Sequence, residues 1–265
     1  MELFASKFDG SRVLRVGILA AERVSYRFAS HVLTVHEPYA HKLRALTRKP
    51  VTVVMNCPDE RVFRPRPWVG WHCGSGVAFG YHGLLAIRHG LVQAIEALAL
   101  VRQTLPLASL RLWGNGDGLN ELHAAVTRLG LSQGVVLPGG PVPLDRMAEE
   151  LRSIHIGLIP SLSDAWTDGV LPTKLLEYAA LGIPVITFRN PVIETYFSEE
   201  CVTYVDPVTP GNLAAAMCLL ATDGERARRQ ATRARQAMRR LAWRTEKQTY
   251  LTFLGAVARR GKHPR

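Results

Sequence analysis

This sequence of 265 residues has little cysteine and no long apolar run, and each shortage excludes a class of protein. Its four cysteines, at positions 57, 73, 201 and 218, form no C-x-x-C pair, which argues against a zinc site or a redox motif. Reduced thiols favour a cytoplasmic protein. No apolar run reaches the roughly 18 residues of a membrane-spanning helix, and the first residues lack the continuous apolar core of a signal peptide.

Acidic residues are scarce relative to basic ones. The chain holds 33 lysines and arginines against 22 acidic residues, so its net charge is +11 and it attracts polyanions. Nucleotides, nucleic acid and anionic membrane surfaces all fit that charge. We expect no nucleic-acid partner, because aromatic residues do not alternate with the basic ones and no known nucleic-acid-binding module is visible. The sequence also has no Asp-x-Asp pair that could hold a metal, so no metal site is expected.

What the sequence does contain is a regular alternation of short apolar runs and amphipathic segments. Strands are predicted at 31–35, 51–54, 77–81, 109–113, 135–138, 155–159, 184–188 and 202–205. Helices are predicted at 37–47, 89–102, 118–130, 144–152, 172–181 and 210–222, and residues 64–76 are typical of a linker. This alternation predicts an α/β fold with a Rossmann-like, doubly wound parallel sheet.

Residues 168–188 carry the strongest functional signal. A helix is predicted from Pro172 to Gly182, because proline suits the first helical position and glycine ends helices. Lys174 and Glu177 are three residues apart and share one face of this helix. The helix dipole disfavours a cation in the first turn, so Lys174 suits a bound anion there, with Glu177 as an acceptor for hydroxyl groups. Such a pairing fits a nucleotide sugar; the alternative is a surface Lys–Glu pair without a ligand.

This segment resembles the donor-site helix of the family-4 glycosyltransferases, retaining enzymes with two Rossmann-like domains (the GT-B architecture). The residues that match the family pattern in order are Pro172, Lys174, Glu177, Tyr178, Ala180, Gly182, Pro184 and Val185. The resemblance implies that Glu177 binds the ribose of the nucleotide. It also implies that the loop Gly169-Val170-Leu171 faces the donor. Many family members have a second glutamate eight residues before the first, and here that position is Gly169.

A second loop, from Gly83 to Gly90, resembles the family loop that approaches the donor diphosphate. Typical members place arginine directly after the first glycine and lysine directly before the second, where this chain has Leu84 and His89. We expect Arg88 to contact phosphate, although a solvated surface arginine is the alternative. Gly83 would allow close approach of the backbone, and His89 would bind phosphate best when protonated.

Other loops after strands give weaker signals. Residues 114–118 resemble a G-x-G step, and their glycines are interpreted as structural because the full G-x-G-x-x-G fingerprint is absent. Gly140 and Val142 lie in a loop that resembles the family's base-reading step, which implies backbone contacts to the nucleotide. Ser161 either binds a ligand or caps a turn, and the capping role is favoured.

The resemblance also implies a domain organisation. Residues 1–66 resemble the end of an acceptor-side N-terminal domain with its linker, residues 67–240 the donor-binding domain, and residues 241–265 a crossover helix and tail. Family members usually carry a much longer N-terminal domain, so we expect this one to be truncated. His31 and His36 flank a predicted strand and are interpreted as packing or surface residues.

Residues 225–240 are rich in arginine and alanine. At helical spacing, one face carries Arg226, Arg229, Arg233, Arg240 and Arg244, and small or apolar residues lie opposite. The simpler interpretation is a solvated helix face. The functional one is peripheral contact with an anionic membrane, at the inner face of the cell membrane, where each basic residue contributes about 1 kcal/mol.

Two functions of different classes follow. The resemblance implies a hexosyltransferase-like enzyme, or its donor-binding part, that moves sugar from a UDP- or GDP-linked donor to a glycan, lipid or small-molecule acceptor. Lys174 and Arg88 would be its catalytic residues, since they would neutralise the diphosphate as charge develops, and no cofactor would be needed. The alternative is a catalytically inactive nucleotide-binding or interaction module. A sugar-nucleotide epimerase is weaker, because no catalytic acid pair can be placed.

Overall fold

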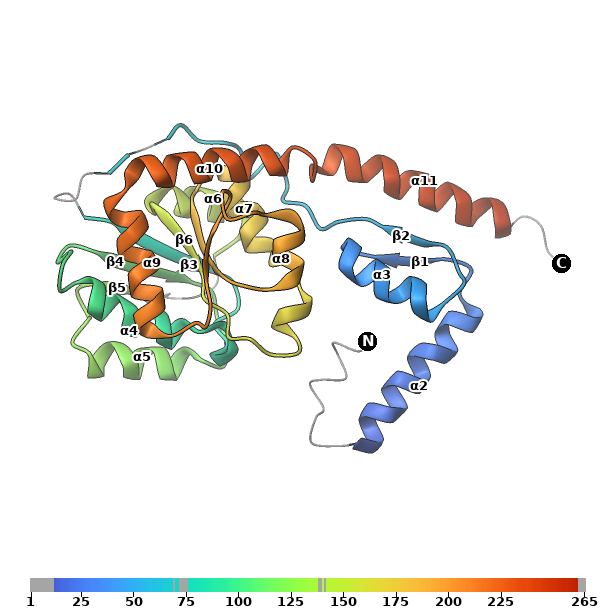
Figure 1. The fold of residues 1–265 in the computed structure, drawn as a ribbon, viewed down its shortest axis with the longest axis horizontal. Coiled ribbons are helices and arrows are strands. Elements are labelled where there is room, and N and C mark those ends of the chain that lie inside the picture. Colours follow the sequence, from blue (N-terminus) through green and yellow to red (C-terminus); the bar gives the residue numbers. More distant parts are fainter. Residues whose placement is uncertain (1–11, 69, 72–75, 138–139, 141, 262–265) are drawn as a thin grey trace.

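The structure is a computed structural model that describes residues 12–68, 70–71, 76–137, 140 and 142–261. Within these residues, six parallel strands form one sheet in the order β5-β4-β3-β6-β7-β8 (Figure 1). The strands are β3 (Ala78–His82), β4 (Ser109–Trp113), β5 (Val135–Val136), β6 (Ile156–Ile159), β7 (Val185–Phe188) and β8 (Thr203–Val205). The predicted α/β fold with a doubly wound parallel sheet is therefore confirmed.

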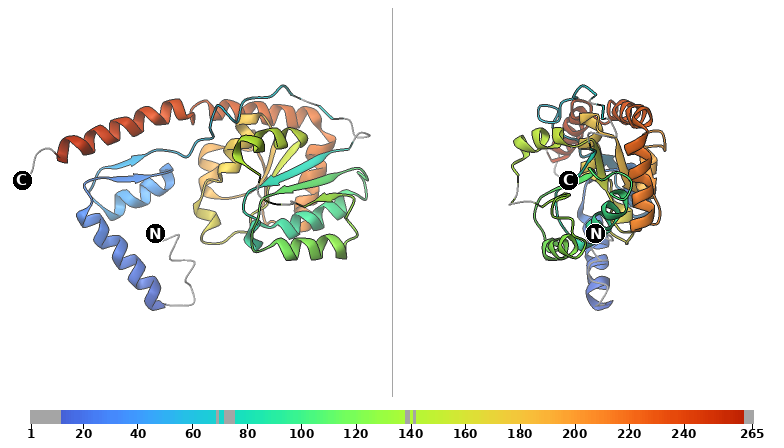
Figure 2. Two further views of the ribbon diagram at one scale, coloured as in Figure 1. Left: turned by 180° about the vertical axis from the view of Figure 1, so that it is seen from behind. Right: turned by 90° about the vertical axis from the view of Figure 1, so that its left-hand side faces the viewer.

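The sheet forms because its central strands are short runs that bury every side chain. All positions of β3, β6 and β7 are buried, as expected for parallel strands covered on both faces. One face packs against α4 (Leu91–Val101), α5 (Leu119–Arg128) and α9 (Pro210–Thr222). The other packs against α6 (Leu144–Glu150), α7 (Thr173–Leu181) and α10 (Gly224–Met238) (Figure 2). The end-on view in Figure 2 shows the sheet between these helical layers.

Several short elements of the structure were not predicted from the sequence pattern. They are α8 (Pro191–Tyr196), η2 (Ile87–His89), η3 (Leu151–Ser153) and η4 (Thr167–Gly169). Six residues are too few to show helical periodicity in α8. Its start is nonetheless encoded, because the Asn190 side chain accepts a hydrogen bond from the Ile193 backbone N–H at 2.6 Å and a proline follows the cap.

The structure corrects three predictions that concern the site or the arginine tract. Pro172 is not the first helical residue: it is the N-cap of α7, with ψ near 126°. The helix predicted from residue 89 begins at Leu91, after η2 and a left-handed Gly90. The arginine tract divides, because α10 ends at Met238 and α11 spans Trp243–Gly261, so Arg240 and Arg244 do not share one helix face with the arginines of α10.

A smaller unit precedes the sheet domain. It consists of α2 (Arg12–Phe28), β1 (Val32–Thr34), α3 (Glu37–Leu46) and β2 (Val51–Val53), with β1 and β2 parallel. Figure 1 shows α11 leading from α10 past this pair of strands. The backbone N–H of Met55 donates to Glu246 of α11 at 2.8 Å, and the rings of His31 and Phe253 meet edge to face. The smaller unit therefore packs against the last helix, α11.

No helix in the described ranges is long and apolar enough to cross a membrane. Among the same residues, no three histidine, cysteine or acidic side chains gather where they could hold a metal ion. Cys57, Cys201 and Cys218 are free thiols, and Cys73 lies outside the described residues.

Candidate functional site

The topology directs attention to one point on the sheet. The chain builds β3, β4 and β5 outward in one direction and then returns to build β6, β7 and β8 in the other. Ligands of such sheets bind outside the carboxyl ends of the strands at this switch point, here between β3 and β6. Gly83 follows β3 there, Ser161 closely follows β6, and α7 begins nearby.

Lys174 in the first turn of α7 lies against Gly83. A Cβ atom added to Gly83 would come within 2.7 Å of Lys174 Cε and 3.0 Å of its Nζ, and Gly83 has a φ of +113°. The same ammonium lies 5.0 Å from the ring centroid of Tyr81. No carboxylate in the described part of the chain forms an ion pair with Lys174. Burial lowers the pKa of Lys174, with partial opposition from Glu177, so an anion bound here would favour its charged form.

Glu177 is joined to the end of β3 by a buried network. Its Oε2 contacts Nε2 of His82, whose Nδ1 lies 3.0 Å from the hydroxyl of Tyr178. That hydroxyl donates to the Gly80 carbonyl at 3.1 Å. Because a carboxylate only accepts hydrogen bonds, Nε2 of His82 carries a proton and donates it to Glu177. One carboxylate oxygen of Glu177 is therefore fixed by His82, and the other can accept hydrogen bonds from a ligand.

Arg88 and His89 lie on η2, beside the same point. Nε of Arg88 is buried and, among the described residues, has no hydrogen-bond partner, which marks an unused donor. Nδ1 of His89 lies 3.3 Å from the hydroxyl of Ser161. Ser161 therefore contacts a site histidine, where the sequence favoured a turn cap. Burial lowers the pKa of His89 to about 4, helped by Lys174 and Arg88, so the imidazole is neutral near pH 7 unless a bound anion raises that pKa.

The glycines of residues 114–118 are structural, as interpreted from the sequence. A Cβ atom at Gly114 would lie 1.8 Å from the Gly83 carbonyl oxygen, and one at Gly116 would lie 2.4 Å from that of Leu85. The backbone N–H of Gly118 donates to this Leu85 oxygen at 2.8 Å. Residues 114–118 thus pack directly against the Gly83 loop. The backbone of that loop leaves no room for a side chain at Gly114 or Gly116.

A cleft of about 640 Å³ lies between the smaller unit and the loop before α7. Its walls include Gly169, Val170 and Leu171 on one side and His36 on the other. Nε2 of His36 lies 3.1 Å from the Gly169 carbonyl oxygen, and Nδ1 accepts from the Tyr39 backbone N–H at 3.1 Å, so Nε2 carries the proton. Burial lowers the pKa of His36, which keeps this neutral tautomer. The loop expected to face the donor sugar therefore borders a cleft and is held by His36.

The structure brings together most, but not all, of the expected site residues. Gly83, Arg88, His89, Lys174 and Glu177 surround the end of β3, and residues 169–171 border the adjoining cleft. Gly140 and Val142 lie in the loop after β5, two strands away from β3 in the sheet. Three residues of that loop, at 138, 139 and 141, lie outside the described residues, so its predicted contact with a nucleotide base stays a prediction.

Two residues of the site were missed or misjudged from sequence. His82 lies directly before Gly83 and fixes Glu177, but a histidine at the end of a strand gives no distinctive local signal. His36 was interpreted as a packing or surface residue, whereas it is only 4% exposed and contacts Gly169 across 133 positions of sequence. The available signal was its place as an N-cap, directly before Glu37 and Pro38.

Comparison with known proteins agrees with this geometry. The family model described as glycosyl transferases group 1 matches residues 76–223, which is more than half of the chain. A curated relative, the amylovoran biosynthesis glycosyltransferase AmsK of Erwinia amylovora, is 25% identical over 233 residues, covering 82% of this chain and 54% of AmsK. The chain therefore spans about half the length of that relative.

Solved structures share the fold at low sequence identity. HepE of Anabaena, in complex with UDP and glucose, superposes with a TM-score of 0.77 at 18% identity, over 93% of this chain and 68% of HepE. The C-terminal domain of a glycosyl transferase group 1 protein (LpcC) from Francisella tularensis superposes with a TM-score of 0.57 at 19% identity, over 68% of this chain and 96% of that domain. With its sheet topology and the family match over β3 to α9, this chain belongs to the glycosyl transferases group 1 family.

Proposed function

We propose that this chain binds a nucleotide-diphosphate sugar at the carboxyl ends of β3 and β6, as the donor-binding part of a retaining glycosyltransferase of the family-4 type. The observation that carries the proposal is the cation of Lys174, unpaired within the described residues and held against Gly83 at the start of α7. A helix N-terminus with a lysine and an unused arginine donor beside it suits a diphosphate. HepE, a neighbour in fold, was solved with UDP and glucose.

In the proposed reaction, the bond between sugar C1 and the diphosphate breaks, and the acceptor hydroxyl oxygen bonds to C1 on the same face. The hydroxyl proton passes to the departing diphosphate. Negative charge grows on the diphosphate as it leaves, and Lys174, Arg88 and the α7 N-terminus would stabilise that charge. These groups supply the positive charge that the step requires, so the proposal includes no metal ion or other cofactor.

Glu177 would hold the ribose hydroxyls with the carboxylate oxygen that His82 leaves free. Because His82 fixes the other oxygen, the side chain is oriented before the ligand arrives, and less entropy is lost on binding. The sugar and its acceptor would occupy the cleft bordered by His36 and residues 169–171. We propose a UDP- or GDP-linked hexose as donor, a glycan, lipid or small molecule as acceptor, and a cytoplasmic location with peripheral contact to the inner membrane face.

A thermal-shift panel with UDP, GDP, ADP and common nucleotide sugars tests the proposal. A ligand at 100 times its dissociation constant stabilises a protein by about 2.7 kcal/mol. We expect one nucleotide class to raise the melting temperature of this chain and to lose that effect in Glu177→Ala. A folded chain that responds to no nucleotide would contradict the proposed donor site.

A catalytically inactive nucleotide-binding module is the second candidate. It is favoured by one observation: this chain has Gly169 at the position where many members of the resembled family carry a second glutamate. Incubation with the nucleotide sugar found in the panel and a set of glycan and lipid acceptors separates the two. Transfer of sugar supports the enzyme, and binding without transfer or hydrolysis supports the module.

A further inference from the structure

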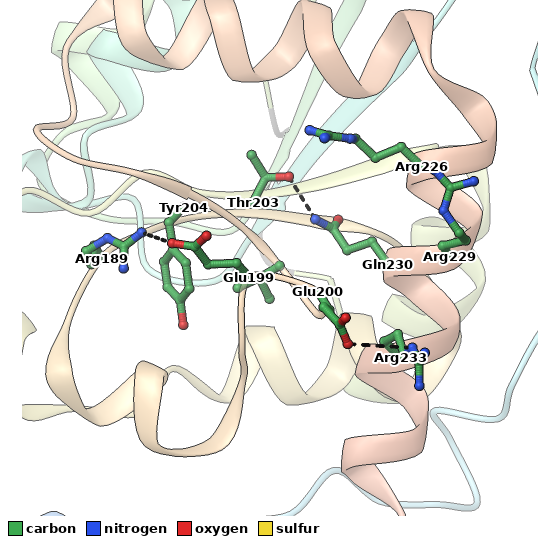
Figure 3. A pocket seen from close by; sticks show the side chains of 10 residues that line it. Arg189, Glu199, Glu200, Thr203, Tyr204, Arg226, Arg229, Gln230 and Arg233 are labelled. Carbon is green, nitrogen blue, oxygen red and sulfur yellow. Dashed lines mark hydrogen bonds and ion pairs between the residues drawn. The ribbon is translucent and has the colours of Figure 1, made fainter.

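A second pocket lies away from the donor site, between β8 and α10 (Figure 3). Its volume is about 490 Å³, and its walls are mostly charged. The residues that line it are Arg189, Glu199, Glu200, Val202, Thr203, Tyr204, Arg226, Arg229, Gln230 and Arg233. None of them belongs to the donor site described above, so this pocket needs its own explanation.

One of its four arginines is already neutralised. Arg189 donates to Glu199 at 2.7 Å and contacts Glu194, and its guanidinium lies 4.5 Å from the ring centroid of Tyr204. A guanidinium with two carboxylates and an aromatic face has its charge satisfied and its position fixed. Arg189 therefore forms a wall of the pocket and is not available to bind a ligand strongly.

The three arginines of α10 are not satisfied in this way. They recur at spacings of three and four residues and therefore project from one face of the helix. Nε of Arg226 is 3.9 Å from Asp223, and Nε of Arg233 is 3.8 Å from Glu200, both beyond hydrogen-bonding distance. Arg229 has no ion pair with any described residue. In the view of Figure 3, Arg226 extends from α10 across the pocket toward Thr203.

The floor of the pocket is rigid and polar. Gln230 is 5% exposed, accepts from the Val185 backbone N–H at 3.2 Å, and donates from Nε2 to Thr203 Oγ1 at 2.7 Å. These two bonds attach the middle of α10 to β7 and β8. Because the Thr203 oxygen accepts this bond, its own hydroxyl proton is available to a ligand. A rigid floor with one spare donor, below three arginines with spare donors, is complementary to an anion with several oxygens.

We propose that this pocket binds a phosphate-bearing anion through Arg226, Arg229, Arg233 and the Thr203 hydroxyl. Phosphate fits this set because the planar guanidinium forms paired hydrogen bonds to phosphate oxygens. The pocket has room for a ligand larger than a lone phosphate, such as a sugar phosphate or a phospholipid head group. The site is separate from donor binding, and its ligand would add an anionic partner to the proposed transferase.

Titration calorimetry with inorganic pyrophosphate, in the presence of saturating UDP to occupy the donor site, tests the free-anion source. Sedimentation with vesicles of equal parts phosphatidylcholine and phosphatidylglycerol tests the lipid source. The test variant is R226Q/R229Q. The matched control is R228Q/R235Q, which removes the same charge from another face of α10. We expect the test variant to weaken binding of pyrophosphate, of vesicles or of both by about tenfold or more, the effect of losing one charge-assisted bond. The control variant should change the affinity for pyrophosphate and for the vesicles by less than about twofold.

The donor site is separated from this pocket by a third variant. With UDP at a saturating concentration, Lys174→Ala should bind pyrophosphate in the α10 pocket with the same affinity as the wild-type chain. R226Q/R229Q should in turn leave the affinity for UDP unchanged. Equal losses in the test variant and its control would overturn the proposal, because they would show general attraction to a basic helix. The proposal would also be overturned if the wild-type chain bound neither pyrophosphate nor the vesicles, whatever the outcome of the nucleotide panel.

Discussion

Lys174 occupies the space that a side chain at position 83 would need: its Cε lies 2.7 Å from where a Cβ of Gly83 would stand. The two residues come from different elements, α7 and the end of β3, and their contact sets the ammonium at the switch point of the sheet. The proposed donor site depends on this contact, because a substitution at either residue changes where the positive charge lies.

Gly83→Ala is expected to weaken nucleotide binding by displacing Lys174. Gly130→Ala is the matched control, since Gly130 also has a positive φ, of +64°, but nothing lies within 4 Å of its added Cβ. Both variants should lose about 1–3 kcal/mol of stability from backbone strain. Only Gly83→Ala should lower UDP affinity, by about tenfold if one charge-assisted contact is lost. Equal UDP affinity in the two variants would remove the proposed role of the Gly83–Lys174 contact.

Glu177 and His82 are expected to be energetically coupled. Glu177→Ala leaves Nε2 of the buried His82 without its partner, which should cost about 1–3 kcal/mol of folding free energy. His82→Ala should cost a similar amount, and the double variant should cost less than the sum. Urea denaturation of the four proteins gives the coupling energy directly. Strictly additive losses would mean that the contact does not orient Glu177.

His36 is expected to hold the loop at 166–171. His36→Ser keeps a good N-cap for α3 but removes the bond from Nε2 to Gly169, whereas His36→Ala removes both. Hydrogen exchange of the amides of residues 166–171 should therefore become faster in both variants. The additional loss of stability, about 1 kcal/mol for a missing cap, should appear only in His36→Ala. Unchanged exchange in His36→Ser would mean that the loop is held without His36.

Stability is expected to fall as the pH drops from 7 to 5. Burial lowers the pKa of His36 and His89 in the folded chain, that of His89 to about 4, from an ordinary value of 6.5. The unfolded chain therefore binds more protons in this window, and protonation favours unfolding. His89, discounted for its partial exposure, should contribute about 1 kcal/mol. As the pH drops from 7 to 5, the melting temperature of His89→Gln should fall less than that of the wild-type chain. An equal fall in both proteins would argue against a buried, neutral imidazole at His89.

Much of the fold could be predicted because each buried strand is a short apolar run between helices of clear periodicity. The residues of the proposed donor site could also be predicted, since Lys174 and Glu177 belong to one helix turn and Arg88 lies just before a helix. Local spacing carries such information. The short helix α8 was missed because six residues show no period.

The contacts that join distant segments could not be predicted. His82 and Glu177 are 95 positions apart, and His36 and Gly169 are 133 apart, so nothing in either local sequence specifies its partner. The α10 pocket could be predicted only in part. The spacing of its arginines placed them on one helix face, but the contact between the buried Gln230 and Thr203 depends on how α10 packs against the sheet. Such pairs are set by tertiary packing, which a single sequence does not display.

The most direct test of the proposed donor site is calorimetric titration of UDP, or of GDP if the panel selects it, into this chain, Lys174→Ala and Lys247→Ala. Lys247 is an exposed lysine of α11, so its variant matches the loss of charge. We predict that Lys174→Ala weakens nucleotide binding by about tenfold or more, and that Lys247→Ala binds as the wild-type chain does. Equal affinity in all three folded proteins would contradict the account, because the cation at the switch point would then not hold the diphosphate.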